Sequence, residues 1–200
     1  MKKFNSNLTS PLIEDYILEK TSVKDGIIDK MHNYAEENEV PIIGPLVGKY
    51  LYQITKITRA KNIFEMGSGF GYSAYWFAKA FSDPGKVICT EYSEAHKFAA
   101  EGFFKKAGYE HHLDFICGDS IEILKNSDEK YDIIFVDPPF AKSLVAPTLA
   151  ALEDNKLVHS GSVVYLEHES ALTTPALPAH WQIIKDKQTS ALRYMLIEIC

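Results

Sequence analysis

Short strand-like runs alternate with amphipathic helical runs from residue 61 onward, and this alternation limits the possible folds more than any other feature. The β-rich runs are Asn62–Met66, Lys86–Thr90, Leu113–Cys117, Tyr131–Val136 and Ser162–Glu167. The helical runs between them are Tyr72–Phe81, Glu94–Ala107, Ser120–Lys125 and Leu144–Leu157. Strands that alternate with helices in this way predict a parallel sheet with helices on both faces.

The two ends of the chain depart from this alternation. Three helical segments precede it, one opening at Ser10-Pro11 and the others covering Val23–Glu39 and Leu46–Ile57. At the other end, Trp181–Lys187 and Leu192–Ile199 are strand-like and joined by a short polar turn, so they predict an antiparallel hairpin. We therefore expect an α/β fold: a Rossmann-like, doubly wound seven-stranded sheet, mostly parallel with a C-terminal antiparallel hairpin, plus N-terminal helices. Residues 1–58 are expected to extend the same domain as residues 59–200.

Charge and composition exclude several classes of protein. The net charge of −6 argues against strong non-specific binding to nucleic acid. Apolar runs such as Ile133–Val136 are far shorter than a membrane span, and the start of the chain does not resemble a secretory signal. Three widely spaced cysteines fit neither a metal site nor a disulfide framework. These features favour a cytoplasmic protein that does not contact membranes.

A glycine-rich segment between the first strand and the next helix predicts the ligand. It reads Glu65-Met66-Gly67-Ser68-Gly69-Phe70-Gly71-Tyr72-Ser73. Glycines let a ligand approach the backbone closely, but the third glycine comes one position earlier than in the dinucleotide fingerprint, where Tyr72 now stands. The carboxylate of Glu65 suits a cationic sulfonium with an amino-acid tail and would repel a diphosphate. We therefore expect S-adenosylmethionine, with S-adenosylhomocysteine as product, and cofactor-binding roles for Glu65, Gly67, Ser68, Gly69, Gly71, Tyr72 and Ser73.

Acidic residues also stand at the ends of the following strands. Glu91 is placed to accept from the ribose hydroxyls, Asp119-Ser120 to meet the adenine edge, and Asp137 to lie at the end of the fourth strand. Any one of them alone is better explained as a solvated loop acid or a helix cap. Glu65 is the fourth acid of this kind. Four acids that stand at successive strand ends around a glycine loop instead predict a cofactor crevice.

The segment Asp137-Pro138-Pro139-Phe140 predicts the chemistry, and we assign these four residues a catalytic role. Two prolines make the loop rigid and leave carbonyls free of competing N–H donors. The Asp137 carboxylate can then accept hydrogen bonds from an exocyclic amino group, while Phe140 offers a ring face for stacking a flipped base. Pro-Pro is alternatively a simple loop stiffener.

Two resemblances to known families meet in this chain. Residues 12–136 resemble the catechol-type O-methyltransferases, through Pro41-Ile42-Ile43-Gly44-Pro45, the glycine loop with its Gly-Tyr-Ser step, Gly118-Asp119-Ser120 and residues 131–137. Residues 131–200 resemble the bacterial 16S rRNA guanine-N2 methyltransferases, through residues 135–140, Leu152-Glu153-Asp154-Asn155, Tyr165-Leu166-Glu167 and Pro178-Ala179-His180-Trp181. The chain thus looks like a recombinant of two methyltransferases joined near Asp137, and both families imply the same fold and cofactor.

The two resemblances imply different acceptors. The rRNA-type resemblance implies amino-group methylation of a guanine-like RNA base, which we favour. The catechol-type resemblance implies a divalent metal held by Asp137 and an Asp-Asn pair, and a homodimer formed through the N-terminal helices. Because Glu167-His168 replaces the Asp-Asn pair, we assign no metal ligands. Metal-assisted O-methylation of a small catechol-like molecule is the alternative, and a cofactor-binding hybrid without turnover is a third.

Overall fold

A computed structural model describes the chain except for residues 1–10, 22–24, 83 and 140. Its elements from α1 to β3 are α1 Pro11–Thr21, α2 Gly26–Glu37, α3 Gly44–Thr58, β1 Asn62–Met66, α4 Tyr72–Ala80, β2 Lys86–Glu91, α5 Glu94–Ala107, the 3-10 turn Glu110–His112 and β3 Leu113–Cys117. The later elements are α6 Ser120–Lys125, β4 Ile133–Val136, α7 Val145–Asp154, β5 Val163–Glu169, β6 Trp181–Gln188 and β7 Leu192–Ile199. Strands and helices alternate from β1 to β5, as the sequence predicts.

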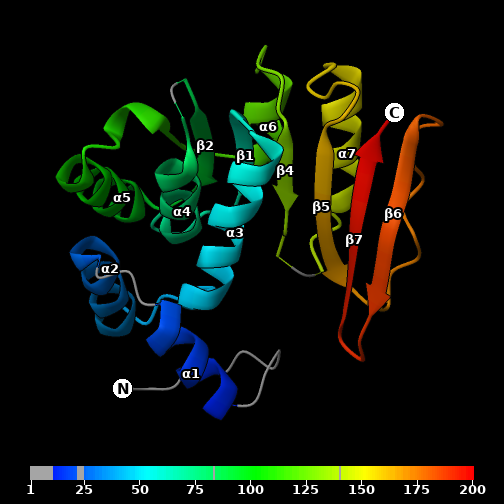
Figure 1. The fold of residues 1–200 in the computed structure, drawn as a ribbon. Coiled ribbons are helices and arrows are strands. Elements are labelled where there is room, and N and C mark those ends of the chain that lie inside the picture. The colour runs from blue at the N-terminus through cyan, green and yellow to red at the C-terminus, as the bar shows by residue number, and fades with distance from the viewer. Residues whose placement is uncertain (1–10, 22–24, 83, 140) are drawn as a thin grey trace.

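The strands form one seven-stranded sheet in the order β3-β2-β1-β4-β5-β7-β6 (Figure 1). The pairs among β1 to β5 are parallel, whereas β7 pairs antiparallel with both β5 and β6. The strand order reverses at β1, where the chain crosses from one half of the sheet to the other. Ligands of open α/β sheets bind beside the carboxyl ends of strands at such a reversal. The predicted Rossmann-like fold is confirmed.

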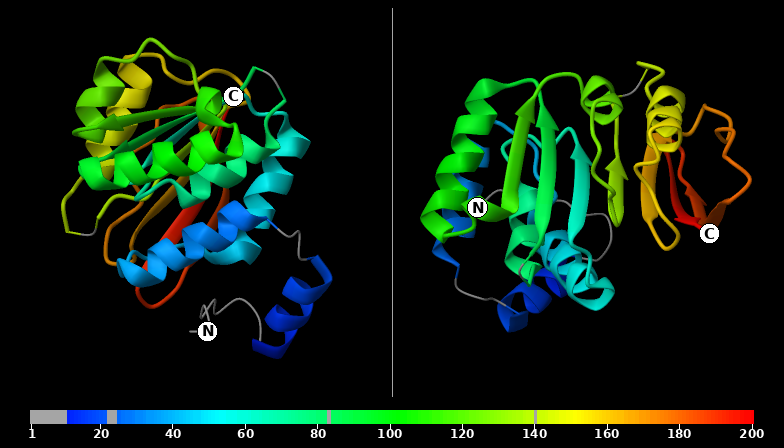
Figure 2. Two further views of the ribbon diagram at one scale, coloured as in Figure 1. Left: turned by 90° about the vertical axis from the view of Figure 1, so that its left-hand side faces the viewer. Right: turned by 90° about the horizontal axis from the view of Figure 1, so that it is seen from above.

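Helices cover both faces of the sheet (Figure 2). On one face, α6 and α7 pack on a hydrophobic cluster that includes Phe64, Ile134 and Leu166. On the other face, α2, α4 and α5 enclose a second cluster that includes Ile63 and Val87. Neighbouring strand residues such as Ile63 and Phe64 thus point to opposite cores, which explains the nearly continuous apolar runs of the parallel strands.

Several element bounds differ from those expected. Strand β5 runs to Glu169 instead of Glu167, because its pairing with β7 continues as far as Glu169 and Leu192. Helix α2 begins only at Gly26, since the Asp25 side chain accepts hydrogen bonds from two backbone N–H groups and caps the helix there. Ser10, Val23 and Phe140 lie outside the described residues. Within the described part of the chain, no helix is long and apolar enough to cross a membrane.

Candidate functional site

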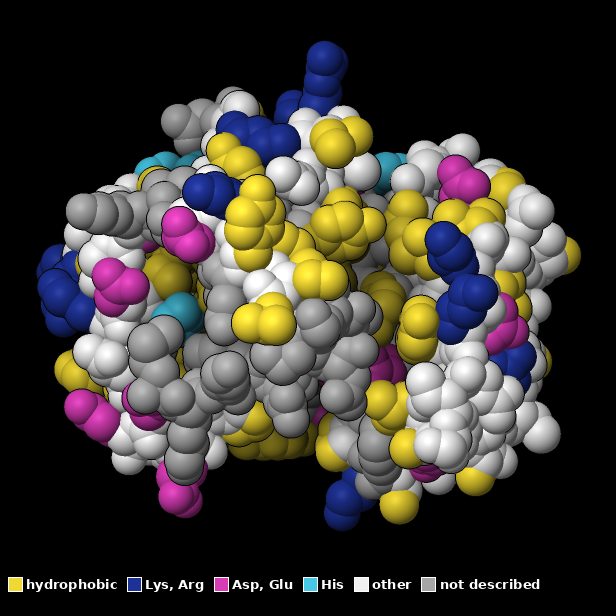
Figure 3. All heavy atoms as spheres, turned by 60° about the horizontal axis from the view of Figure 1, so that its bottom comes forward, with side chains coloured by type: hydrophobic (Ala, Val, Ile, Leu, Met, Phe, Trp, Pro, Cys, Tyr) yellow, Lys and Arg dark blue, Asp and Glu magenta, His cyan; other side chains and the backbone are white. Residues whose placement is uncertain are grey.

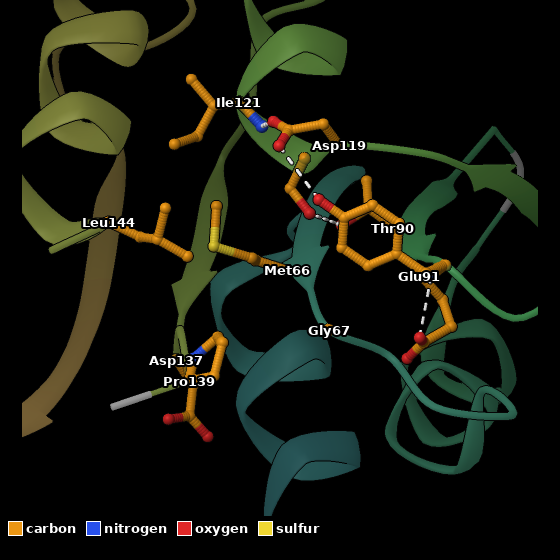
Figure 4. A pocket seen from close by; sticks show the side chains of 11 residues that line it. Met66, Gly67, Thr90, Glu91, Asp119, Ile121, Asp137, Pro139 and Leu144 are labelled. Carbon is orange, nitrogen blue, oxygen red and sulfur yellow. Dashed lines mark hydrogen bonds between the residues drawn. The ribbon is translucent and has the colours of Figure 1, made fainter. Parts of the chain in front are cut away.

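A pocket lies at the carboxyl ends of the central strands, where the sheet order reverses (Figure 4). Its lining includes six of the residues expected from the sequence, namely Gly67, Glu91, Asp119, Ser120, Asp137 and Pro139. Its other lining residues are Met66, Thr90, Tyr92, Ile121 and Leu144. The structure therefore brings the acids that follow β2, β3 and β4 to one pocket, and it adds apolar and aromatic walls that the sequence did not indicate.

The glycine loop needs backbone angles that disfavour other residues. Gly67, Gly69 and Gly71 have φ values of +77°, +52° and +78°, all in the left-handed region. A Cβ on Gly71 would also lie 3.3 Å from the Cβ of Ala100 in α5. The N–H groups of Gly67 and Ser68 each donate to the carbonyl of Thr90 at 3.0 Å. The loop is thus fixed against the end of β2, with Gly67 facing the pocket.

Glu65 lies beneath this loop and does not line the pocket. Its carboxylate is buried and accepts a hydrogen bond from the Ser73 hydroxyl at the start of α4. Burial raises the pKa of Glu65 above its ordinary value. Ser68, Gly69, Gly71 and Tyr72 also lie outside the pocket lining. Their roles in cofactor binding stay predictions, and the observed contacts of Glu65 and Ser73 connect β1 to α4 under the loop.

Two acids on the pocket wall hold neighbouring backbone groups in place. The Glu91 carboxylate accepts from the N–H of Gly69 at 3.1 Å and from that of Tyr92 at 2.8 Å, so it ties the glycine loop to β2. Asp119 caps α6 by accepting from the N–H groups of Ile121 and Glu122 at 2.9 and 3.1 Å. The ribose and adenine contacts predicted for these acids stay predictions.

Tyr92 was not anticipated, although it directly follows the strand-end acid. Its hydroxyl donates to Asp119 at 3.0 Å, while the residue remains 71% exposed and lines the pocket. An exposed aromatic ring held by its hydroxyl is a ready surface for a flat heterocycle. Next to it, the hydroxyls of Thr90 and Ser120 are 2.7 Å apart and join the ends of β2 and β3.

Asp137 follows β4 and borders the same pocket, with Pro139 beside it. Pro138 is buried, whereas Asp137 and Pro139 are accessible. Although Asp137 is open to the pocket, the protein around its carboxyl and the negative charge of Glu167 raise its pKa to about 6. Phe140, the last residue of the predicted catalytic segment, lies outside the described residues.

Glu167 and Tyr165 extend the site along β5. The Tyr165 hydroxyl donates to Glu167 at 2.7 Å, and its ring packs on Phe135 of β4 at 5.8 Å between centroids. Figure 3 looks toward this end of the sheet and shows acidic side chains recessed between hydrophobic ones. Because the Tyr165 hydroxyl already donates its proton to Glu167, the side chains near Asp137 present hydrogen-bond acceptors to a ligand. Such a surface suits a ligand that brings donors.

The metal arrangement of the catechol-type resemblance does not fit these side chains. Successive residues of a strand point to opposite faces, so Glu167 and His168 cannot both face Asp137. His168 is 1% exposed, and its Nδ1 is 2.8 Å from the carbonyl oxygen of Glu169. Among the described residues, no group of three or more His, Cys, Asp or Glu side chains could hold a metal ion.

Comparison with known proteins places the chain in a family. Residues 85–198, more than half of the sequence, match the family described as "Conserved hypothetical protein 95". The chain belongs to this family. The match runs across Asp137, so the expected join between the two resemblances is not a boundary of the family.

Relatives of both expected kinds are found. The chain is 29% identical over 167 residues to a catechol O-methyltransferase of Niastella koreensis, which covers 76% of this chain and 75% of that protein. It is 37% identical over 84 residues to the ribosomal RNA small subunit methyltransferase D of Buchnera aphidicola, which covers 40% of this chain and 42% of that protein. The O-methyltransferase from Bacillus cereus, solved with SAH, has the same fold, with a TM-score of 0.75 at 19% identity over 94% of this chain and 97% of that one. Both resemblances are confirmed, and the chain is an S-adenosylmethionine-dependent methyltransferase.

Proposed function

We propose that this methyltransferase acts on an exocyclic amino group of a guanine-like base in RNA. The observation that carries the proposal is Asp137, an accessible carboxylate on the pocket wall followed by two prolines. On the neighbouring strand β5, behind the pocket lining, Glu167 acts on Asp137 through its charge and accepts a hydrogen bond from Tyr165. An amino group brings two donors to this surface, whereas a phenolate would bring a negative charge towards two carboxylates.

Different parts of the pocket are expected to bind the cofactor and the acceptor. Tyr92, Asp119 and Ser120 lie at the β2 and β3 ends, where the adenine of the cofactor is expected. Gly67 and Asp137 lie at the β1 and β4 ends, where its methionine part and the acceptor would meet. Pro139 and Leu144 give the acceptor side of the pocket apolar walls. This arrangement supports cofactor and acceptor sites that share the edge near Asp137.

Asp137 has two tasks in the proposed reaction. Its ionised carboxylate accepts a hydrogen bond from the amino group and turns the nitrogen lone pair towards the methyl group. Bound S-adenosylmethionine supplies that methyl group as an electrophile. When the nitrogen–carbon bond forms and the sulfur–carbon bond breaks, the nitrogen must lose one proton, and the Asp137 carboxylate is placed to accept it. Glu167 keeps the surroundings negative and so favours this proton transfer.

O-methylation of a small molecule is a second candidate, because the Niastella enzyme matches three quarters of this chain. The distinguishing experiment measures transfer of labelled methyl from S-adenosylmethionine, with and without EDTA. The acceptors are under-methylated small-subunit ribosomal RNA, the corresponding ribosomal particle, and a panel of catechols. We expect label in RNA or in the particle, and with free RNA as the acceptor this label should be unaffected by EDTA.

Other outcomes of this experiment would overturn the proposal. EDTA-sensitive label in catechols would show that the chain uses a metal and an oxygen acceptor. EDTA-resistant label in catechols would show metal-independent O-methylation. Absence of label in every acceptor would leave the third hypothesis, a hybrid that binds the cofactor without turnover. Asp137→Ala serves as the control, because transfer to RNA must fall with this substitution if Asp137 acts as proposed.

A further inference from the structure

The segment between β4 and α7, residues 137–144, carries the proposed acceptor-binding residues, and we call it the acceptor loop. Among the residues of this loop that the structure describes, two have unusual backbone angles: φ is +58° at Ala141 and +52° at Ser143. Residues with a Cβ avoid this left-handed region because the Cβ approaches the following carbonyl oxygen. Neither residue is one that commonly adopts these angles, so a contact outside the loop is needed to stabilise this conformation.

Glu169 supplies such a contact. The N–H of Ala141 donates to Glu169 Oε1 at 3.0 Å, a hydrogen bond between segments 28 positions apart in the sequence. The backbone N–H groups of Glu169 itself and of Ala141 lower the pKa of the Glu169 carboxyl. The bond is therefore charge-assisted at neutral pH, which makes it stronger than a bond between neutral groups.

The backbone of Glu169 is held by the rigid end of the sheet. Glu169 is the last residue of β5 and pairs with Leu192 of β7. Immediately after it, the N–H of Ser170 donates to the carbonyl of Ala191 at 2.9 Å. The N–H of Leu172 donates to the carbonyl of Glu169 at 3.1 Å. Glu169 thus connects a well-paired strand end to a loop whose angles are unfavourable.

We propose that Glu169 is a positioning residue for methyl transfer. Its carboxylate holds Ala141, and through Ala141 it keeps Asp137 and Pro139 at the wall of the pocket. Glu169 does not line the pocket, so it acts on the reaction only through the loop. This role rests on the proposed function of Asp137. The hydrogen bond itself, however, can be tested without any methyl acceptor.

The first test uses Lys142, an exposed lysine between the two left-handed residues. Limited digestion with trypsin cuts after Lys142 only when the loop opens. We expect Glu169→Ala to raise the rate of this cleavage about tenfold. Glu169→Gln keeps an oxygen acceptor and should stay within about twofold of the wild-type rate. The matched control is Asp186→Ala, which removes the ion pair with Arg193 in the adjacent hairpin but no contact to the loop.

The second test measures transfer to RNA and binding of S-adenosylhomocysteine by calorimetry. Glu169→Ala should lower kcat about tenfold while the Kd for S-adenosylhomocysteine stays within about twofold, because the cofactor side of the pocket is untouched. Glu169→Gln should restore most of kcat. Adding Ala141→Gly to Glu169→Ala should restore part of it, since glycine accepts the left-handed angle at little cost.

The results separate this proposal from the proposed function. If Glu169→Ala folds and neither cleavage nor kcat changes, the positioning role is wrong. Faster cleavage with unchanged kcat would reduce Glu169 to a structural contact and would also overturn it. If the wild-type chain does not methylate RNA, the proposed function fails, whereas the trypsin rates still report whether Glu169 holds the loop.

Discussion

At the scale of single residues, Asp137 combines accessibility with an unfavourable charge. Partial desolvation of the carboxyl by the surrounding protein and the charge of Glu167 raise its pKa to about 6. Since the folded pKa is raised, ionised Asp137 lowers stability as the pH rises from about 4 to about 6. Carboxyl groups whose ionised form is disfavoured in this way are common where a group acts as a base. Its neighbours therefore favour reactivity over stability.

The pH dependence of transfer tests this assignment. Only the ionised carboxylate can accept a proton, so the rate with RNA should rise about tenfold between pH 5 and pH 7 and level off above. Asp137→Asn should flatten this profile and lower the plateau about a hundredfold. The same variant should be at least as stable as the wild type at pH 7.5 in thermal unfolding. A wild-type rate that is independent of pH across this range would argue against a base with a pKa of about 6.

At the scale of elements, α2 packs along α4 and reaches the glycine loop. Its cap Asp25 forms an ion pair with Lys79 of α4 at 2.5 Å, and both side chains are largely buried. Further along α2, His32 Nε2 lies 2.6 Å from the hydroxyl of Tyr72, and Tyr34 packs on Phe70 of the glycine loop at 4.8 Å between ring centroids. Helix α2 thus supports the loop that we expect to bind the cofactor.

Substitution of Asp25 measures how much the attachment of α2 to α4 contributes to the free energy of unfolding. Asp25→Ala removes both the helix cap and the ion pair, so the free energy of unfolding should fall by about 2 kcal/mol. Asp25→Asn keeps a capping oxygen but not the charge, and it should lose about half as much. Urea denaturation gives both values, with the exposed Glu37→Ala on the same helix as control. Equal free energies of unfolding for Asp25→Ala and the control would show that the N-terminus of α2 contributes little to stability.

At the scale of the whole molecule, the sequence predicts the sheet well because its order follows from chain-wide alternation. Strands β1, β3 and β7 begin and end at the predicted residues. The extension of β5 to Glu169 could not be predicted, since Glu167-His168-Glu169 has no apolar pattern and becomes strand only through its pairing with β7. Pairing between distant segments is a property of the fold, not of the local sequence.

The candidate site, like the sheet, is predicted from the sequence only in part. The strand-end acids reach the pocket because all parallel strands end at one edge, which the topology alone determines. Glu65 turns inward to Ser73, and Tyr92 and Glu169 gain their contacts from loop geometry, which no spacing rule indicates. The sequence therefore predicts which strand ends form the site, whereas the orientation of individual side chains needs the structure.

The chemical identity of the methylated product tests the central claim most directly. Under-methylated small-subunit ribosomal particles are incubated with the chain and labelled S-adenosylmethionine, and the RNA is digested to nucleosides for mass spectrometry. We predict that the label is found on the exocyclic nitrogen of guanosine and is lost with Asp137→Ala. Label that appears only on an oxygen of a catechol supplied in the same reaction would contradict the account.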